Sequence, residues 1–389
     1  MKNIAGIIIC LLLTLSAFAG YDVAAIVWPA YHPEPRWREL GIFPHGNGEW
    51  QNVYEAKAKF KGHSQPLVPL WGYEREDNPV AVARKIDAAL AAGVNVFMYD
   101  WYWYGGRPFL EGALNNGFLK APNSGRMKFF LMWANHDVDF LWNNKVHGAE
   151  KNKIIWSADV SYGEFTKVLV PRFVEYFKRS NYYKINGKPV FAVYLMKNMV
   201  RGMGGAKKAK EAIDFLRSEC VKAGLKGLHL MSLRADNLSL PVDANANPTP
   251  KEVAEFYGFD SMSTYNWTGS RNRGYKYWRE TSIAKWSEFK RQFGVFFPVV
   301  STGWDSNPRW PVEKTSLICA GKSPVEYEKA LRIAKHWADE NISDEFPKLI
   351  LINAWNEWTE GEYLEPDKQF GYEYLNATAR VFGGCGQAE

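Results

Sequence analysis

Eight short runs of apolar residues, many of them β-branched or aromatic, recur along the chain and alternate with helix-like stretches. Runs that are apolar on both faces and separated by helices predict strands of a parallel sheet. Eight such units favour a (β/α)8 barrel over a doubly wound sheet, and no GxGxxG motif follows the first run. We therefore predict an α/β fold, a single (β/α)8 TIM barrel with long loops at its C-terminal face. The runs are residues 23–28, 94–99, 128–133, 189–194, 228–232, 259–263, 298–302 and 349–353.

The composition is that of one globular domain. Of the 389 residues, 47% are hydrophobic and 23% are charged, which excludes a disordered or collagen-like chain. No repeat or Pro/Ser-rich linker divides the sequence, and barrel domains often exceed 200 residues. The formal charge is +6, but Lys and Arg are scattered, so the sequence does not indicate a nucleic-acid partner. We expect a monomer.

Residues 1–19 have the features of an export signal. Lys2 supplies the positive charge, an apolar stretch follows, and Ala17-Phe18-Ala19 forms a small-x-small cleavage site. The apolar stretch is shorter than the roughly 20 residues that span a bilayer. The sequence thus predicts a signal peptide at 1–19 and an exported domain at 20–389, periplasmic, cell-surface or secreted, with no membrane span after cleavage. Export would leave Cys220, Cys319 and Cys385, whose spacing fits no zinc motif.

Polar and aromatic residues follow most of the predicted strands. In a barrel these positions converge on one opening. Rings pack against the apolar faces of sugars, and sugar hydroxyls need fixed donors and acceptors, so the set predicts a carbohydrate site. For any single ring, packing of the barrel is an equally good explanation. The predicted substrate-binding residues are Tyr31, His32, Asp100, Trp101, Trp103, Trp133, Asn135, His136, Tyr194, Arg234, Tyr265, Asn266, Trp304, Trp355, Asn356 and Glu365.

Glu357 and Glu360 form the sharpest candidate for chemistry. They lie three residues apart beyond the last predicted strand, and a helical turn would place both carboxyls on one side. Two close carboxylates in an aromatic, water-poor surround raise the pKa of one of them, which yields an acid and a base near neutral pH. The alternative is a surface helix start, where Glu is common. The flanking Trp355 and Trp358 favour the catalytic interpretation.

Motifs for other chemistries are missing from the sequence. It contains no HExxH, no GxSxG elbow and no P-loop. Asn135-His136-Asp137 offers metal ligands, but it lacks a second ligand cluster and is better explained as a hydrogen-bonding triplet. We predict no metal and no cofactor.

Five motifs, in this order, resemble the WbsX-type family, which is related to glycoside hydrolase family 99, the endo-α-mannosidases and endo-α-mannanases. The resemblance runs from about residue 22 to 376, and its last motif is the most specific. The motifs are WPAYHP (28–33), GNGEWQNV (46–53), YDWYWYGGR (99–107), LMWANHD (131–137) and INAWNEWTEGEYLEPD (352–367).

The resemblance implies a (β/α)8 glycosidase that cleaves an α-glycosidic bond with retention. It implies that Glu357 deprotonates the substrate's 2-hydroxyl, which attacks C1, and that Glu360 is the general acid/base. Tyr265 matches a tyrosine position that lines the family's site. Thr359 stands where His is usual and Glu362 where a small polar residue is usual, so mannose specificity stays open.

Three functions remain possible from the sequence. The favoured one is an exported hydrolase of a complex polysaccharide or glycan. The second is a glycosyltransferase of the WbsX type, although no diphosphate-binding Gly loop is visible. The third is a non-catalytic glycan-binding protein. Arginines in the mouth loops further suggest an acidic substrate, because Arg forks bind carboxylate and sulfate. They are Arg107, Arg234, Arg271 and Arg273.

Overall fold

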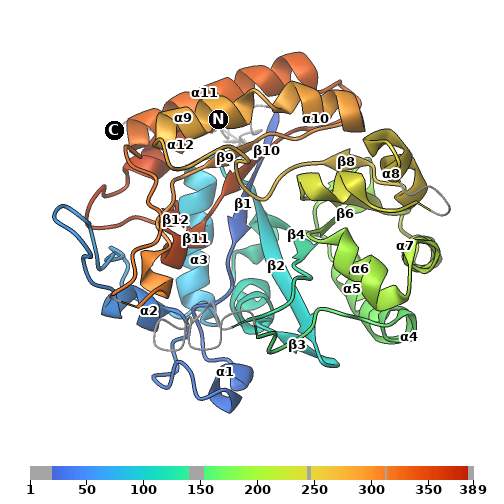
Figure 1. Ribbon diagram of the computed structural model, residues 1–389, viewed down its shortest axis with the longest axis horizontal. Helices are drawn as coiled ribbons and strands as arrows, with labels where there is room; N and C mark the ends of the chain where they lie inside the picture. Colours follow the sequence, from blue (N-terminus) through green and yellow to red (C-terminus); the bar gives the residue numbers. More distant parts are fainter. Residues whose placement is uncertain (1–19, 140–152, 243–246, 312, 384–389) are drawn as a thin grey trace, which may run out of the picture.

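The computed structural model describes residues 20–139, 153–242, 247–311 and 313–383 (Figure 1). Within them a curled parallel sheet forms the centre of the molecule, and each predicted run supplies one of its strands. The sheet order is β8-β7-β6-β4-β2-β1-β10-β9, so chain neighbours are sheet neighbours throughout. The strands are β1 (Tyr21–Val27), β2 (Val96–Tyr104), β4 (Lys128–Trp133), β6 (Lys188–Val193), β7 (His229–Ser232), β8 (Ser261–Met262), β9 (Val299–Ser301) and β10 (Lys348–Asn353).

The two edges of the sheet meet. A parallel bridge joins Met262 of β8 to Phe296, just before β9, and the Met262 N–H donates to the Val295 carbonyl at 2.9 Å. The predicted (β/α)8 architecture is therefore confirmed. Two short antiparallel strands extend the main sheet, β3 (Arg107–Phe109) beside β2 and β5 (Lys184–Ile185) beside β6. The strands β11 (Asn356–Glu357) and β12 (Glu362–Tyr363) form a separate hairpin.

Helices cover the outside of the sheet, and several begin at a sequence-encoded cap. Asn78 accepts from the Val80 N–H before α3, and Thr249 and Glu252 form a capping box at α8. The helices are α1 (Pro35–Glu39), α2 (Trp50–Glu55), α3 (Pro79–Ala91), α4 (Tyr162–Glu164), α5 (Val170–Phe177), α6 (Met196–Met203), α7 (Ala206–Lys222), α8 (Pro250–Tyr257), α9 (Tyr275–Ile283), α10 (Trp286–Phe293), α11 (Pro324–Asn341) and α12 (Glu373–Phe382).

Two of the helical segments are interrupted. The stretch 162–179 contains a π-helical turn at Phe165–Leu169 before α5, beside Pro171, which has no N–H to donate to the preceding turn. The stretch 277–293 divides into α9 and α10. In Figure 1 these two helices lie with α11 and α12 along one side of the sheet. Both ends of the described chain lie there too, since the rings of Tyr21 and Phe382 are 5.8 Å apart.

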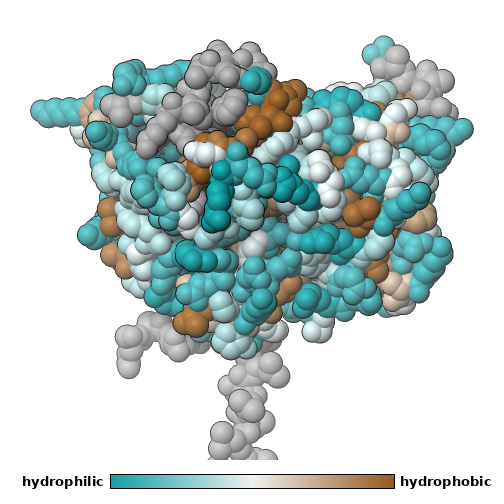
Figure 2. All heavy atoms as spheres, turned by 90° about the horizontal axis from the view of Figure 1, so that it is seen from below, coloured by the Kyte–Doolittle hydropathy of each residue, from teal (hydrophilic) through white to brown (hydrophobic). Residues whose placement is uncertain are grey.

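The core is the sheet and the inward faces of its helices. All nine residues of β2 are buried, as expected of a strand covered on both sides. The face shown in Figure 2 is mostly hydrophilic, with small separate apolar patches. Cys220 and Cys319 are buried free thiols, while Cys385 and the predicted signal peptide lie outside the described residues. In the described part of the chain, no helix is both long and apolar enough to cross a bilayer.

Candidate active site

The β11–β12 hairpin carries the two candidate acids. Glu357 pairs with Glu362 across the hairpin, and a 3-10 turn, Trp358–Glu360, connects the strands. Gly361 completes the turn with a φ of +66°, and a Cβ there would lie 3.0 Å from the Asp305 backbone nitrogen, so glycine is required. The turn directs Glu357 and Glu360 to the same side. One carboxylate oxygen from each of Glu357, Glu360 and Glu362 lies within 4.8 Å of the others.

A cavity of about 690 Å³ opens beside this hairpin at the C-terminal ends of the strands. Glu357 and Glu360 lie in its wall, and so do seven of the predicted substrate-binding residues. The side chain of Glu360 is 17% exposed, whereas Glu357 is only 4% exposed. The seven are Asp100, His136, Tyr194, Arg234, Tyr265, Asn266 and Trp304.

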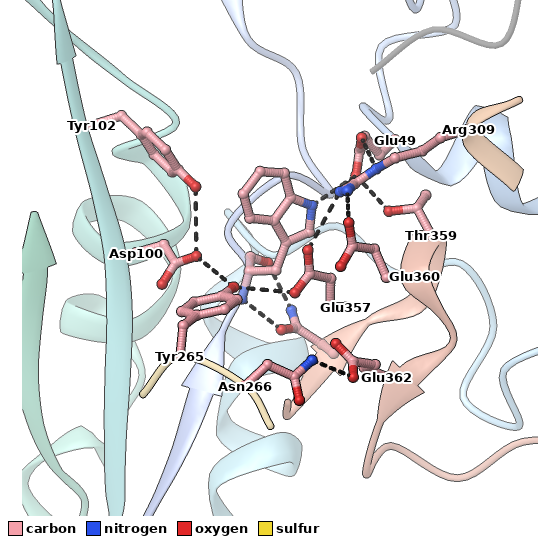
Figure 3. Close-up of polar contacts among 12 residues, drawn as sticks. Glu49, Asp100, Tyr102, Tyr265, Asn266, Arg309, Glu357, Thr359, Glu360 and Glu362 are labelled. Atoms are coloured by element: carbon pink, nitrogen blue, oxygen red, sulfur yellow. Dashed lines mark hydrogen bonds and ion pairs between the residues drawn. The ribbon is translucent and has the colours of Figure 1, made fainter. Parts of the chain in front are cut away.

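Arg309 forms ion pairs with the acids of the site, and it was not among the predicted residues. Its guanidinium lies 2.5 Å from Glu360, 3.5 Å from Glu357 and 3.3 Å from Glu49 (Figure 3). Arg309 comes from the loop after β9 and stacks at 5.2 Å over the ring of Trp28. The ion pairs fix Arg309 between the long first loop and the hairpin. No local sequence pattern marks this residue, because its partners lie up to 260 residues away.

Glu49 holds the Arg309 guanidinium in place through an ion pair. It is fully buried and accepts hydrogen bonds from Trp28 Nε1 at 2.7 Å and from the Thr359 hydroxyl at 2.9 Å. The preceding Gly48 has a φ of +63°, and a Cβ there would lie 2.1 Å from the Ala30 carbonyl oxygen. The GNGEW motif thus brings the loop close enough to place Glu49. Thr359, which departs from the family pattern, contributes to this anchor.

The three carboxyls of the hairpin hold protons more strongly than isolated carboxyls do. Burial raises the pKa of Glu357 well above its usual range, and the Glu360 charge raises it further, while Arg309 opposes the shift. Burial also raises the pKa of Glu360, against the opposing charges of Arg309 and Arg271. Burial, with Glu360 next, raises the pKa of Glu362 to about 8. The site therefore retains protons at neutral pH.

A chain of hydrogen bonds leads from Glu357 into the barrel (Figure 3). The Tyr265 hydroxyl lies 3.1 Å from Glu357 and 3.0 Å from Asp100. One hydroxyl has one proton to donate, so a second proton is needed for both contacts to be hydrogen bonds. Burial supplies the reason for its retention, because it raises the pKa of Asp100 well above the usual range. Tyr102, at 3.5 Å from Asp100, also lines the cavity and was not among the predicted residues.

The remaining predicted residues lie behind the cavity wall. Side chains alternate along β2, so Asp100 and Tyr102 face the cavity while Trp101 and Trp103 point to the helices. There Trp101 donates to Glu111 and Trp103 to Glu164. Because side chains alternate along a strand, the YDWYWY segment predicts that Tyr102 shares a face with Asp100 and that the two tryptophans lie on the opposite face.

The other residues behind the wall serve packing or backbone positioning. Tyr31 stacks on Trp50 at 4.1 Å, Trp133 lies against Phe165, and Trp355 against Phe97. These positions correct the expectation that every polar or aromatic residue after a strand faces the opening. The polar ones bond the main chain: His32 that of Pro33, Asn135 that of Leu195, and Asn356 that of Trp28.

Glu365 belongs to a buried charged group between the hairpin and α3. It lies 2.6 Å from Lys85 of α3 and accepts from Trp358 Nε1 at 2.8 Å. Lys85 also contacts Glu76 at 3.1 Å, and Asn356 donates to Glu76. These contacts hold the hairpin against α3. Glu365 is thus directed away from the cavity.

Comparisons with known proteins agree with this architecture. A family model described as "Glycosyltransferase WbsX" matches residues 23–378. The uncharacterized protein WxcX of Xanthomonas campestris pv. campestris is 24% identical over 380 residues, which cover 92% of this chain and 49% of that protein. The chain therefore spans about half the length of the curated relatives it matches.

Solved structures share the fold. A "Glycoside hydrolase-like protein" matches with a TM-score of 0.58 and 15% identity, over 94% of this chain and 95% of its own. The GH99 endo-α-mannosidase from Bacteroides thetaiotaomicron matches with a TM-score of 0.56 and 15% identity, over 92% of this chain and 95% of its own.

Proposed function

This chain belongs to the WbsX family, and on that premise we propose that it is a retaining glycoside hydrolase that cleaves an α-glycosidic bond in a complex polysaccharide or glycan. Its fold is shared with GH99 enzymes, which supports the proposal without determining the substrate. The reacting groups are Glu357 and Glu360. The observation that carries the proposal is that both carboxyls face one cavity, close together, with pKa values raised by burial.

This arrangement suits acid–base cleavage of an acetal. Cleavage needs an acid that protonates the leaving oxygen and a base that takes a proton from the group attacking C1. Carboxyls near 5 Å apart are typical of retaining enzymes, whereas inverting enzymes need about 6.5–9.5 Å to admit water. The 4.8 Å limit on the carboxylate oxygens here falls in the first class.

The roles of the two acids follow from the family resemblance. Glu357 takes the proton of the substrate's 2-hydroxyl while O2 attacks C1, and Glu360 gives a proton to the departing oxygen. An anhydrosugar with an O2–C1 bond results. Glu360, now a carboxylate, then takes a proton from water as the water oxygen attacks C1. The O2–C1 bond breaks in this step, and Glu357 returns its proton to O2. Both acids end as they began, and the product keeps its anomeric configuration.

Arg309 imposes a condition on this cycle. Its 2.5 Å contact stabilises the charged form of Glu360, while Glu357 lies farther away and deeper in the protein. Of the two carboxyls, Glu357 is therefore the one on which a shared proton is favoured. Before the first step the proton must move to Glu360, and substrate that shields Glu360 from Arg309 would favour this transfer. The nearby Tyr265 and Asp100 offer Glu357 an exchange partner for protons.

A glycosyltransferase is the second candidate, and the description of the matching family favours it. Such an enzyme would transfer sugar from an activated donor. The hydrolase is preferred because the cavity presents paired acids. The sequence contains a DxD pair, Asp137 and Asp139, but Asp137 is paired with Arg201 and neither aspartate lines the cavity. A non-catalytic glycan-binding protein is the third candidate, and it would not need two neighbouring carboxyls with raised pKa values.

We also propose that the protein is exported, with residues 1–19 as a cleaved signal peptide and 20–389 as a single monomeric domain. The export proposal is supported by the positive charge of Lys2, the apolar stretch that follows it and the small-x-small site Ala17-Phe18-Ala19. N-terminal sequencing of protein recovered from fractionated cells tests it. A mature chain that begins at Gly20 is expected, and an intact Met1 terminus in the cytoplasm would contradict it.

The hydrolase proposal is tested by incubating the protein with a panel of polysaccharides and sizing the products. Release of shorter glycans by the wild type, and its loss in Glu360→Gln, is expected. Glu255→Gln, which changes an exposed glutamate on α8, is the matched control and should stay active. Transfer from nucleotide sugars without hydrolysis would favour the glycosyltransferase, and binding without turnover would favour the glycan-binding protein.

A further inference from the structure

Three arginines line the cavity, and two of them are held by acids. Arg309 is paired with Glu49, Glu357 and Glu360. Arg234 forms a fork with Asp236, at 3.0 and 3.1 Å, and donates to the Tyr194 hydroxyl at 3.0 Å. Both guanidinium groups are thus committed to the protein itself.

Arg271 differs from these two. Its guanidinium carbon lies 3.4 Å from the centre of the Trp304 ring and 4.9 Å from that of Trp278. Within the described ranges no acid pairs with it and no acceptor bonds its side chain. Stacking holds the guanidinium plane while its N–H groups stay in the plane and free to donate. Arg271 and Trp304 both line the cavity, so this cation is offered to whatever enters.

Arg271 also lies close to the reacting pair. Its charge lowers the pKa of Glu360 and of Glu362 against the larger effect of burial. Among the described residues, neither carboxyl forms an ion pair or a hydrogen bond with Arg271, so its N–H donors are not occupied by them. An anion bound by Arg271 would therefore sit next to the bond that is cleaved.

We propose that Arg271, stacked on Trp304, binds a carboxylate or sulfate carried by the substrate, which makes the substrate an acidic glycan. The inference rests on the proposed function in one respect, that the bound substrate is cleaved. The binding of the anion by Arg271 does not depend on the proposed function. A guanidinium presents paired N–H donors that match the two oxygens of a carboxylate or sulfate. Trp304 provides an apolar face for the ring that bears the anion.

Two other arginines that the sequence suggested as ligands of an acidic substrate do not line the cavity. Arg107 pairs with Glu39 at the exposed end of β3, and neither residue lines the cavity. Arg273 is exposed and stacks at 4.2 Å on Tyr277, also outside the cavity wall. Arg273 is therefore a matched control: it lies two residues from Arg271 and has the same charge and a similar aromatic contact.

The test is a binding measurement in the Glu360→Gln background, which keeps the ligand intact. The probes are an array of glycans that contain uronic acid or sulfate, each beside its carboxyl-reduced or desulfated counterpart. We expect at least one acidic member to bind about 10- to 100-fold more tightly than its counterpart, the range of hydrogen bonds to charged groups. The uronate and sulfate arms identify which anion is preferred.

Variants then assign the preference to Arg271. Arg271→Gln should bring the acidic and neutral members of a pair to equal affinity, and Arg273→Gln should keep the preference. Arg271→Lys keeps the charge without the fork and should fall between them. Melting temperatures of all three variants identify any loss of folding. Equal binding of both members by the parent protein, a preference that survives Arg271→Gln, or no acidic ligand at all would overturn the proposal.

Turnover separates this inference from the proposed function. Hydrolysis of neutral and acidic members at equal rates by the wild type would refute the anion site and leave the hydrolase. Selective binding of acidic members without hydrolysis by the wild type would refute the hydrolase and leave the anion site.

Discussion

The Arg309 guanidinium contacts the carboxylate of Glu360 at 2.5 Å, the shortest of its ion pairs with the three acids around it. The contact joins the loop after β9 to the turn that carries Glu360. It stabilises the charged form of a residue whose burial favours the neutral form. Small changes around Glu360 therefore decide whether it holds a proton, which is the property required of a residue that alternates between acid and base.

Glu360→Gln should reduce turnover by at least about 100-fold, since general acid catalysis contributes on that scale. Gln keeps the size of Glu360 and can still accept from Arg309, but it cannot give up a proton. Initial rates on the polysaccharide found by the panel measure the effect. Near-normal turnover, with Glu255→Gln as reference, would remove Glu360 from the mechanism.

The product should keep the anomeric configuration of the substrate. One carboxylate oxygen of Glu357 lies within 4.8 Å of one of Glu360, a separation typical of retaining enzymes and shorter than the roughly 6.5–9.5 Å that inverting enzymes use to admit water. Proton NMR of the earliest product, before mutarotation, measures this. An inverted product would contradict the assignment of these two neighbours as the reacting pair.

Arg309→Gln should lower the free energy of unfolding by about 3–5 kcal/mol, the usual cost of leaving a buried charge unpaired. The charge is that of Glu49, which is fully buried and loses its cation. Urea unfolding measures the change. The exposed Arg273 provides the comparison, because Arg273→Gln should change stability by less than about 0.5 kcal/mol. An equally small effect of Arg309→Gln would show that Glu49 does not depend on the ion pair.

Glu362 should make the protein less stable as the pH rises from 5 to 8. Burial raises its pKa from 4.5 to about 8, so in this interval the folded chain keeps a proton that the unfolded chain releases. The stabilisation is complete below pH 4.5 and declines as the pH rises toward 8, with a slope of at most about 1.4 kcal/mol per pH unit. Glu362→Gln, neutral at every pH, should flatten the curve of unfolding free energy against pH. An unchanged slope would show that Glu362 is ionised in the folded protein.

Tyr265→Phe should lower turnover by at least about tenfold and move the pH–rate profile. The hydroxyl bridges Asp100 and Glu357 at 3.0 and 3.1 Å, and its loss removes a hydrogen bond that lowers the pKa of Asp100. The basic limb should therefore move to higher pH. Tyr277→Phe, outside the cavity, serves as the control. A drop in rate with an unmoved profile would mean that Tyr265 only shapes the cavity.

The fold could be predicted because each barrel strand is buried on both faces and leaves a continuous apolar run in the sequence. The Glu357–Glu360 turn could be predicted because its spacing and flanking tryptophans are local. Arg309 and Glu49 could not, since each lies in an irregular loop and acquires its role from a partner 260 residues away. Trp101 and Trp103 were selected for their type alone, whereas β-strand alternation assigns them to the helix side.

Lys85 contacts both Glu76 and Glu365, and these buried ion pairs hold the β11–β12 hairpin against α3. Because α3 and two separate loops meet at one buried ammonium group, the turn with Glu357 and Glu360 is ordered as the domain folds, not when a sugar arrives. For the proposed hydrolase, the free energy of glycan binding could then be used to distort the sugar ring at the scissile bond, because the two acids need not be brought into position.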